Sequence, residues 1–249
     1  MHYAYSSATP LFLYSKADGS NANFGPDWTP SSRKISTDSA RFFGTCERNA
    51  HSPPAEYLSY TGPVKDESGS VVSDLRPIEA FYVGRDASRN SVNVWMGCQG
   101  VTTHTHYDVS HNLYVQLYGR KRFVLFPPGA ASAVYLFPKS HPSHRSSQVP
   151  DFLNVSLGNF PRMKQCLAPS PELPNNTSRL ACTVSTDARA LCGADALTEG
   201  DRRAVVVDLG PGDVLYLPPF WFHRVTALTT SISVNVWSDA DAEMWVSVV

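Results

Sequence analysis

The sequence predicts a single, mainly β protein, and three observations support this. Apolar runs are short and rich in Val, Tyr, Phe and Trp, and 19 Pro and 15 Gly punctuate the chain between them. This texture is typical of many short strands joined by turns. Long helical periodicity is scarce. A length of 249 residues with 42% hydrophobic residues suits one such domain with a sizeable core.

The N-terminal part of the chain is the less regular part. Residues 16–39 are polar and contain Gly, Ser, Asn and Pro, so we expect a long surface loop there. Residues 53–60 begin with two prolines, which favours the start of a short helix. From residue 91 the pattern sharpens, because Val92, Val94 and Met96 alternate with other residues as in a strand with two different faces.

A predicted hairpin and a predicted insert follow. Apolar residues alternate over 113–118, Gly119-Arg120 is typical of a tight turn, and a return strand runs to Phe126 before Pro127-Pro128. Residues 163–203 are polar and irregular. A stretch of this length without secondary structure is unusual inside a compact domain, so we expect a flexible inserted loop.

The C-terminal part predicts strands again. Residues 205–209 lead into a Gly-Pro-Gly-Asp turn, and residues 214–217 form a short run that ends at two prolines. In the last strand, residues 231–237, Val and Ile occupy one face and small polar residues the other. A strand with these two faces suits a barrel with a polar site in its interior.

Charge and cysteine content exclude some classes of protein. The net charge of −1 gives no sign of an overall field for nucleic acid or membranes. No stretch approaches the roughly 18–20 apolar residues of a membrane span, and the first residues do not resemble a signal peptide. The five cysteines are odd in number and scattered, so we expect reduced thiols in a cytoplasmic or nuclear protein, and no disulfide.

The run from Thr103 to Asp108 carries the chemistry. His106 and Asp108 are two residues apart, and side chains at that spacing share one face of a strand. His223 supplies a second imidazole from a distant segment. Two His and one carboxylate form the facial triad of non-haem Fe(II) oxygenases, which leaves coordination positions open. An H-x-D pair alone is weak, and a lone His after Trp is often only structural.

A lysine strengthens the prediction. Lys121 is in phase with the apolar Phe123 and Leu125, and a lysine there is costly unless it meets an anion or extends to solvent at the strand end. A dicarboxylate bound to the metal would supply that anion. Thr103, three residues before the first ligand, could add a hydroxyl group to the same carboxylate. His104 is also two residues from a ligand, and we leave it out of the metal site.

Residues 102–128 and 210–237 closely resemble the JmjC domain, and the similarity covers roughly 53–163 and 204–237. It is greatest for the compact JmjC-only hydroxylases. The resemblance implies a double-stranded β-helix, a cupin-like jelly roll with a few flanking helices, that uses Fe(II), 2-oxoglutarate and O2. It divides the chain into an N-terminal flanking segment, 1–52, and a catalytic domain, 53–249, with the insert at 163–203.

The resemblance also assigns residues. It implies iron ligands at His106, Asp108 and His223. It places the distal carboxylate of 2-oxoglutarate at Lys121 and Thr103. The remaining assignments are pocket-lining positions and candidate tyrosines: Asn112 and Asn235, with Tyr57 or Tyr60 as an upstream tyrosine.

The implied activity is hydroxylation of a C–H bond in a macromolecule, either a protein side chain or a tRNA base, with release of succinate and CO2. The alternatives are a catalytically silent binding module, a histone lysine demethylase, and a cupin hydrolase or isomerase with another metal. The cluster His141 to Arg145 could contact an anionic substrate such as RNA, or could simply pack at the barrel rim. The oligomeric state stays open between a monomer and a weak homodimer.

Overall fold

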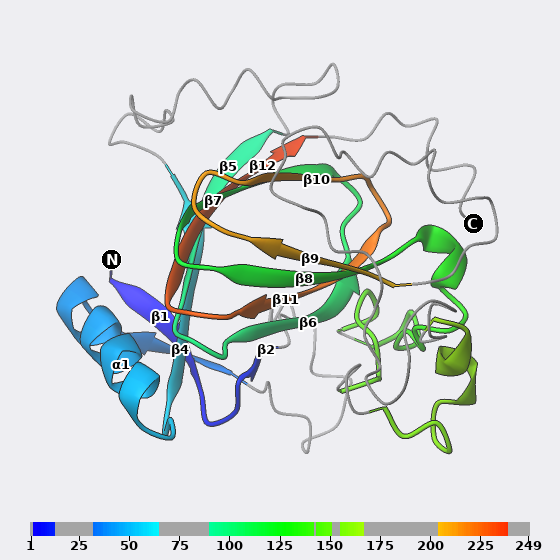
Figure 1. Cartoon of the computed structure of the whole chain (residues 1–249), viewed down its shortest axis with the longest axis horizontal. Helices are drawn as coiled ribbons and strands as arrows, with labels where there is room; N and C mark the ends of the chain where they lie inside the picture. The colour runs from blue at the N-terminus through cyan, green and yellow to red at the C-terminus, as the bar shows by residue number, and fades with distance from the viewer. Residues whose placement is uncertain are drawn as a thin grey trace, which may run out of the picture.

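Two β-sheets face each other and curve into a barrel (Figure 1). The computed structural model describes residues 2–12, 32–64, 90–141, 143–150, 155–166 and 204–238. The larger sheet contains, in spatial order, β10 (Val214–Leu217), β7 (His111–Tyr118), β12 (Ser231–Ser238), β5 (Ser91–Gly97), β4 (Tyr57–Pro63), β1 (Tyr3–Ser7) and β3 (Arg33–Ser36). The smaller sheet contains β2 (Leu11–Phe12), β6 (Thr102–Tyr107), β11 (Phe222–Ala227), β8 (Lys121–Phe126) and β9 (Val205–Leu209).

The order of the strands confirms the double-stranded β-helix. From β5 to β8 the chain alternates between the two sheets, and from β9 to β12 it retraces that path in the opposite direction. Each sheet therefore contains strands from both halves of the chain. This crossing brings β11 beside β6 and β12 beside β7, although more than 100 residues separate them in sequence. Residues distant in sequence consequently share one interior.

The predicted hairpin is confirmed, and its turn requires glycine. Gly119 between β7 and β8 has φ +67°, and an added Cβ would collide with the carbonyl of Thr230. The strand β8 is buried on both faces, which explains its nearly continuous apolar sequence. Phe123 and Leu125 face the barrel interior, whereas Val124 and Phe126 pack on its outer surface. The barrel wall therefore separates two apolar clusters.

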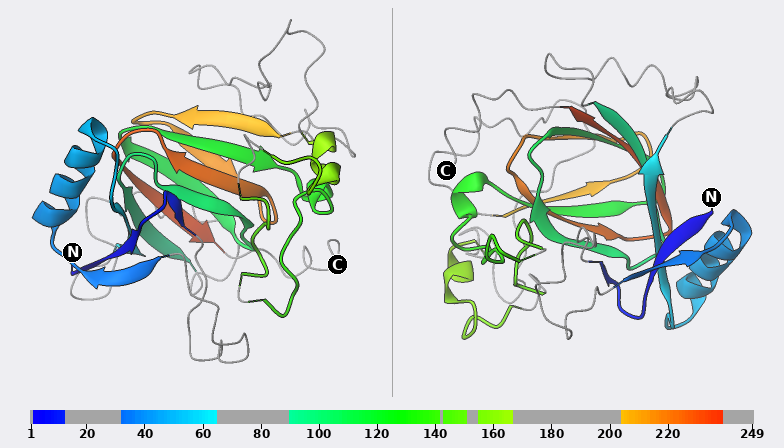
Figure 2. Two further views of the ribbon diagram at one scale, coloured as in Figure 1. Left: turned by 90° about the horizontal axis from the view of Figure 1, so that it is seen from below. Right: turned by 180° about the vertical axis from the view of Figure 1, so that it is seen from behind.

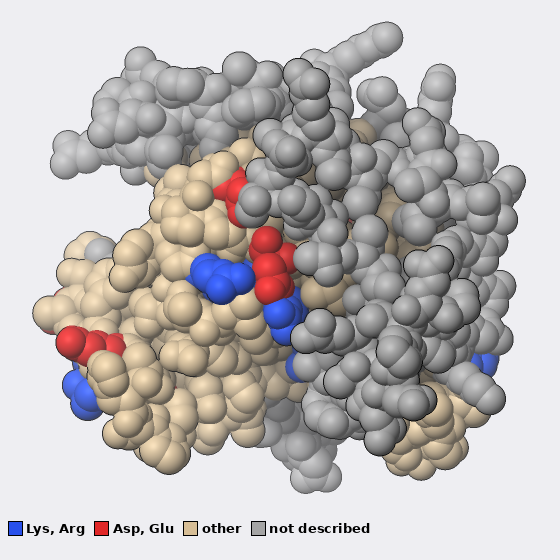
Figure 3. Space-filling model, in the orientation of Figure 1, with Lys and Arg blue, Asp and Glu red and all other residues tan. Residues whose placement is uncertain are grey.

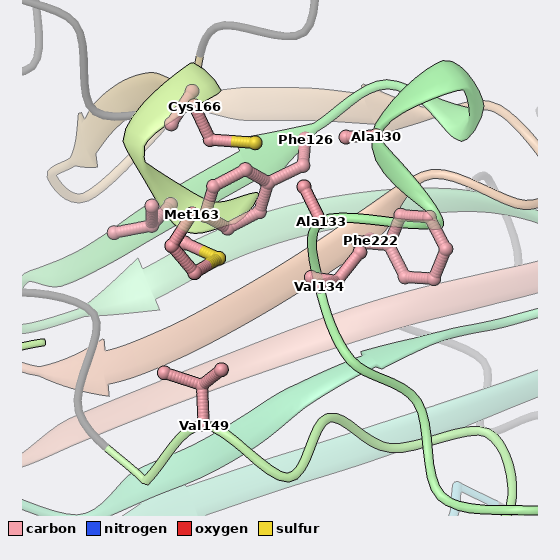
Figure 4. Packing of buried hydrophobic residues seen from close by; sticks show 10 residues of the cluster. Phe126, Ala130, Ala133, Val134, Val149, Met163, Cys166 and Phe222 are labelled. Atoms are coloured by element: carbon pink, nitrogen blue, oxygen red, sulfur yellow. The ribbon is translucent and has the colours of Figure 1, made fainter. Parts of the chain in front are cut away.

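The outer cluster covers one side of the barrel. The segment after β8 includes the short helices η4 (Pro128–Ala130) and η5 (Pro161–Gln165). It packs against Phe126 and Phe222, and the ring of Phe126 lies beside Met163 and Cys166 (Figure 4). Residues 163–166 of the predicted insert therefore belong to ordered structure, and residues 167–203 lie outside the described part of the chain.

A helix that the sequence did not predict packs on the opposite side of the barrel. The α-helix α1 (Ser39–His51) begins where the Asp38 side chain accepts a hydrogen bond from the Arg41 amide. Its buried face contains Phe42 and Cys46, which pack with Leu58. Figures 1 and 2 show α1 and residues 128–166 on opposite sides of the barrel. The helix was missed because its apolar stripe is only a few residues wide.

Two predictions for the N-terminal part are wrong. Residues 57–63 form β4, not a helix, because this segment pairs with β1 on one side and β5 on the other. Residues 33–36 of the predicted surface loop form β3, which pairs with β1, and residues 16–31 lie outside the described residues. Strands from before residue 53 thus join the larger sheet, while the domain boundary at residues 52 and 53 stays a prediction.

The prediction of reduced thiols is also wrong for one pair. Cys46 of α1 and Cys98, at the end of β5, form a disulfide, and Cys166 is a buried free thiol. The two cysteines are distant in sequence, and the packing of α1 on the sheet brings them together. A disulfide removes the argument from cysteine usage for a cytoplasmic or nuclear location, which stays a prediction.

Charged groups pair across strands on the barrel surface. Figure 3 shows basic and acidic side chains in contact near the centre of one face. Arg122 of β8 and Asp208 of β9 form one such pair, with a distance of 2.6 Å between Nε and Oδ1. Exposed pairs of this kind contribute little to stability. Arg122 and Asp208 are directly opposite each other in the register of β8 and β9, and opposite charges at such positions are favourable.

Candidate metal centre

The three predicted ligands meet at one end of the smaller sheet. His106 on β6 lies directly opposite His223 on β11 in the strand register, and Asp108 follows immediately after β6. One ligand atom from each of the three residues lies within 4.8 Å of the others. The pairing of β6 with β11 is what closes the gap of more than 100 residues in sequence. A cluster that could hold a metal ion is therefore present.

The spacing within the cluster leaves room for an ion. The Nε2 atoms of His106 and His223 lie 4.0 and 3.7 Å from the two carboxylate oxygens of Asp108. These distances are too long for hydrogen bonds. Asp108 Oδ2 is buried and has no hydrogen-bond partner among the described residues. A buried carboxylate oxygen without a partner is costly, and a metal ion would satisfy it.

Backbone carbonyl groups orient both imidazoles. The Nδ1 atom of His106 lies 2.7 Å from the carbonyl oxygen of His104, and Nδ1 of His223 lies 3.1 Å from that of Trp221. A carbonyl only accepts, so the Nδ1 atoms carry the hydrogens and the Nε2 lone pairs are directed at the cluster. This is the arrangement in which neutral imidazoles bind metals.

One imidazole of the cluster is uncharged, and the cluster is open to solvent on one side. Burial, and then the neighbouring His106, lower the pKa of His223 to about 4, so this imidazole is uncharged at neutral pH. The side chains of His106 and Asp108 are 25% and 24% exposed, whereas that of His223 is 5% exposed. Solvent and small ligands therefore reach the cluster from the side of His106 and Asp108.

A β-bulge decides which neighbours face the interior. His223 pairs with His106 and Val225 with Thr103, so β6 has one residue more than β11 over this interval. Thr103 and His106 consequently share the interior face, although strict alternation would separate residues three apart. His104 is not part of the cluster of three ligands, and burial, followed by Arg224, lowers the pKa of its imidazole to about 4.

Lys121 lies deeper in the same barrel. It pairs with Ala227 in the register of β8 and β11, four residues beyond the metal-cluster residue His223. Four strand residues correspond to about 13 Å. The lysine is 7% exposed, and its Nζ donates a hydrogen bond to the hydroxyl of Tyr114 at 2.6 Å. Burial lowers the pKa of Lys121 to about 7, which indicates an ammonium group that lacks a compensating anion.

The two predicted asparagines bind each other. Asn235 on β12 donates from Nδ2 to Oδ1 of Asn112 on β7 at 3.0 Å, and it accepts a hydrogen bond from Nε1 of Trp95 at 2.7 Å. Both asparagines are buried on the interior faces of their strands. The structure therefore brings them to the interior of the barrel, and their contact with a co-substrate stays a prediction.

The tyrosine at Lys121 was missed. Tyr57 and Tyr60, the two candidates from the sequence, pack against the cluster around Leu58, and a contact of either with a co-substrate stays a prediction. Tyr114 takes the position beside the lysine because positions 112, 114 and 116 of β7 alternate toward the interior. That alternation was visible in the sequence. The choice of Tyr114 over an upstream tyrosine depended on the fold.

The His141–Arg145 cluster lies beside the metal cluster. Ser146 bridges to His106, and the amide of Tyr107 donates to the carbonyl of Arg145, so this segment extends along the free edge of β6. Residues 121–150 contain no Asp or Glu. The exposed side chains of Lys139 and Arg145 therefore give the rim a positive character.

Comparisons with known proteins agree with the geometry. The cupin-like domain family matches residues 37–244. Over 150 residues the chain is 28% identical to "Lysine-specific demethylase JMJ31" of Arabidopsis thaliana, covering 60% of this chain and 21% of that protein. It is 26% identical over 204 residues to "Lysine-specific demethylase JMJ30" of the same plant, covering 82% and 38%. It is 27% identical over 147 residues to human "tRNA wybutosine-synthesizing protein 5", covering 59% and 33%.

The alignments span only part of these relatives, between 21% and 38% of their length. Separately, no helix in the described part of the chain has the length and apolar character that crossing a membrane requires.

Proposed function

The chain belongs to the cupin-like JmjC family, and from this premise we propose that it is an Fe(II)- and 2-oxoglutarate-dependent dioxygenase. The reaction is hydroxylation of a C–H bond in a macromolecular substrate. The observation that carries the proposal is the pairing of two features in one barrel interior. A cluster of two imidazoles and one carboxylate lies at the open end of the barrel. The buried ammonium of Lys121 lies deeper, opposite the residue of β11 that is four positions after His223.

The donor set suits Fe(II). His106, Asp108 and His223 would hold the ion through two nitrogens and one oxygen, which is the set found in non-haem iron oxygenases. When bound, the iron supplies the oxidation chemistry: O2 and 2-oxoglutarate are consumed, one oxygen atom enters the substrate, and succinate and CO2 are released. The carbonyl groups that hold the Nδ1 atoms keep both imidazoles aimed at the ion.

The chain's own residues would orient the co-substrate. The Lys121 ammonium would bind the distal carboxylate of 2-oxoglutarate, and Thr103, on the same face of β6 as His106, would add its hydroxyl group. Asn112 and Asn235, on β7 and β12 of the larger sheet, line the same interior space. Phe123 and Leu125 on β8 keep water from the part of the barrel between the metal cluster and Lys121.

The macromolecular substrate would approach from the open side of the cluster, where His106 and Asp108 are partly exposed. The segment 136–147 flanks this side and would contact the substrate with its exposed basic residues. A protein side chain and an RNA base both suit such a rim. Two of the relatives are named lysine-specific demethylases, so a methylated lysine side chain is one candidate within the protein substrates.

Turnover of 2-oxoglutarate tests the proposal directly. The purified chain with Fe(II), ascorbate and 2-oxoglutarate should form succinate slowly even without the macromolecular substrate. His106→Ala and Asp108→Ala should abolish this succinate and the binding of Mn(II), because each removes one ligand of the ion. His144→Ala, which removes an exposed imidazole outside the cluster, is the matched control and should leave both unchanged.

Two outcomes would contradict the assignment in different ways. Full turnover in both ligand variants would show that the iron lies elsewhere. Tight binding of 2-oxoglutarate by the wild-type chain, with no succinate across a broad panel of proteins and RNAs, would favour a silent binding module on the same fold.

A further inference from the structure

The segment 135–148 extends the smaller sheet beside the metal cluster. Ser146 bridges to His106 on the edge of β6, and Leu136 in turn bridges to Ser147. Neighbouring strands are about 4.8 Å apart, so the outer stretch of this segment lies roughly 10 Å from the backbone of the ligand His106. A macromolecule that brings a group to the cluster over this edge therefore contacts residues 135–148.

This side of the barrel carries positive charge without neighbouring carboxylates. Three basic side chains are exposed on it: Lys139, Arg145 and Arg162. The described segments 128–150 and 155–166 contain no Asp or Glu. Apart from the ligand Asp108, the acidic residues of the described chain lie on or close to α1, on β9 and in the turn after β9. A local basic surface of this kind attracts an anionic partner, although the net charge of the whole chain is −1.

Two aromatic residues on the same side have a strained backbone. Among the described residues other than glycine, only Tyr135 and Phe220 have a positive φ, 51° and 68°. Bulky side chains are disfavoured in this left-handed region, and such strain is concentrated at functional sites. The amide of Phe220 donates to the carbonyl of the ligand Asp108 at 2.8 Å, so this strain lies next to the metal cluster. Glycine would remove the strain, and an aromatic residue at both positions therefore indicates that the rings themselves have a role.

Planar groups stack on one another at three places on this side. The pairs are Tyr107 with Phe220 at 6.1 Å between ring centroids, Phe137 with His141 at 4.2 Å, and the Arg162 guanidinium 4.5 Å above the ring of Tyr135. All six residues are half-buried or exposed. Aromatic rings and guanidinium planes beside positive charges are the groups on which unpaired bases stack. An acidic peptide has the charge that suits this surface but no series of flat faces, so the stacked groups favour a nucleic acid.

We propose that this surface, made of residues 135–148 with Tyr107, Arg162 and Phe220, binds a single-stranded nucleic acid and delivers an unpaired base to the metal cluster. The inference rests on the proposed function and deepens it by naming the class of the macromolecular substrate. The exposed basic side chains would bind phosphates, and the rings would stack with the bases that flank the reactive one. A base-paired stem offers the phosphates without free base faces, so an unpaired strand should bind more tightly.

Binding to four probes tests the class of the ligand. Fluorescence anisotropy is measured without O2 on the full chain loaded with Mn(II). The probes are an unstructured RNA of about 12 nucleotides, the DNA of the same sequence, the RNA in a duplex, and a polyglutamate peptide of equal charge. We expect at least one single strand to bind about tenfold or more tightly than the duplex and the peptide, with an affinity that falls as salt rises. The tighter of the two single strands identifies RNA or DNA as the natural ligand.

Two variants locate the surface. Phe220→Gly removes the ring and the strained conformation but keeps the amide that donates to Asp108, and it should raise the Kd of the single strand about fivefold or more. Phe43→Ala, an exposed aromatic residue of α1, is its matched control and should leave that Kd unchanged.

The double variant Lys139→Gln, Arg145→Gln should weaken all single strands alike and reduce the slope of log affinity against log salt by about 1–2. The matched control is Arg33→Gln, Lys34→Gln, which removes the same charge from exposed residues of β3 and should change neither quantity.

Three results would overturn the inference. The first is single strands that bind no better than the duplex. The second is a peptide that binds more tightly than either strand, which would identify an acidic protein as the partner. The third is wild-type affinity in the double variant, which decides the matter even if Phe220→Gly does not fold. In each case, succinate formed from 2-oxoglutarate by the wild-type chain would leave the proposed function standing. A chain that binds single strands and forms no succinate would contradict the proposed function and, with it, the delivery of a base to the cluster.

Discussion

Replacing Lys121 by Met should stabilise the ligand-free protein and at the same time remove its affinity for 2-oxoglutarate. Met has a similar length and no charge, so it can fill the space beside Tyr114 without a buried ammonium. The two opposite effects come from one cause. An ammonium held in the barrel for an anion is unfavourable whenever that anion is absent.

The magnitude follows from the pKa of Lys121. Burial lowers it from 10.5 to about 7. The unfolded chain therefore holds this proton more tightly than the folded chain does. The resulting penalty on the free energy of unfolding is complete below pH 7, where it reaches about 5 kcal/mol, and it disappears as the pH rises from 7 toward 10.5. Replacement by an apolar side chain should recover roughly 1–4 kcal/mol of this.

Urea unfolding at neutral pH, followed by tryptophan fluorescence, measures the change. In thermal unfolding, the same gain should raise Tm by about 2–4 °C for each kcal/mol in a chain of this length. Adding 2-oxoglutarate and Mn(II) should then stabilise the wild-type protein and leave Lys121→Met unchanged. The control is Lys139→Met, an exposed lysine on the rim, whose effect should stay within about 0.5 kcal/mol. A Lys121→Met variant less stable than wild type, or one that binds 2-oxoglutarate equally well, would refute the reasoning.

Two further predictions concern pH and the disulfide. The Kd of 2-oxoglutarate should rise by up to about tenfold for each pH unit above pH 7, because the neutral form of Lys121 must take up a proton when the carboxylate binds. Calorimetry in buffers of different ionisation enthalpy measures that proton, and a Kd that is flat between about pH 6.5 and pH 8.5 would contradict a lysine with this pKa. The double variant Cys46→Ala, Cys98→Ala should lose about 4 kcal/mol of unfolding free energy, because the disulfide closes a loop with a sequence separation of 52 residues. Equal urea midpoints for the double variant and the wild type would show that the bond adds no stability.

Local sequence patterns were sufficient for much of the barrel. The alternation in residues 113–118 and 231–237, the glycine turn at 119 and the prolines after Phe126 each depend on neighbouring residues, and the strands lie where these patterns placed them. The helix over 39–51 and the strand over 57–63 did not follow from local patterns. Both form because packing on the sheet and pairing with two neighbouring strands outweigh weak local preferences.

The sequence by itself determined the residue types of the candidate site: two His and an Asp at strand spacing, and a lysine in an apolar phase. The tertiary structure alone decided how they work together. The pairing of β6 with β11 brought His223 opposite His106, and the bulge turned Thr103 to the interior. The facing of the two sheets placed Tyr114 on Lys121. Spacing along a strand fixes which side chains share its face, whereas register and bulges depend on contacts between strands that are distant in sequence.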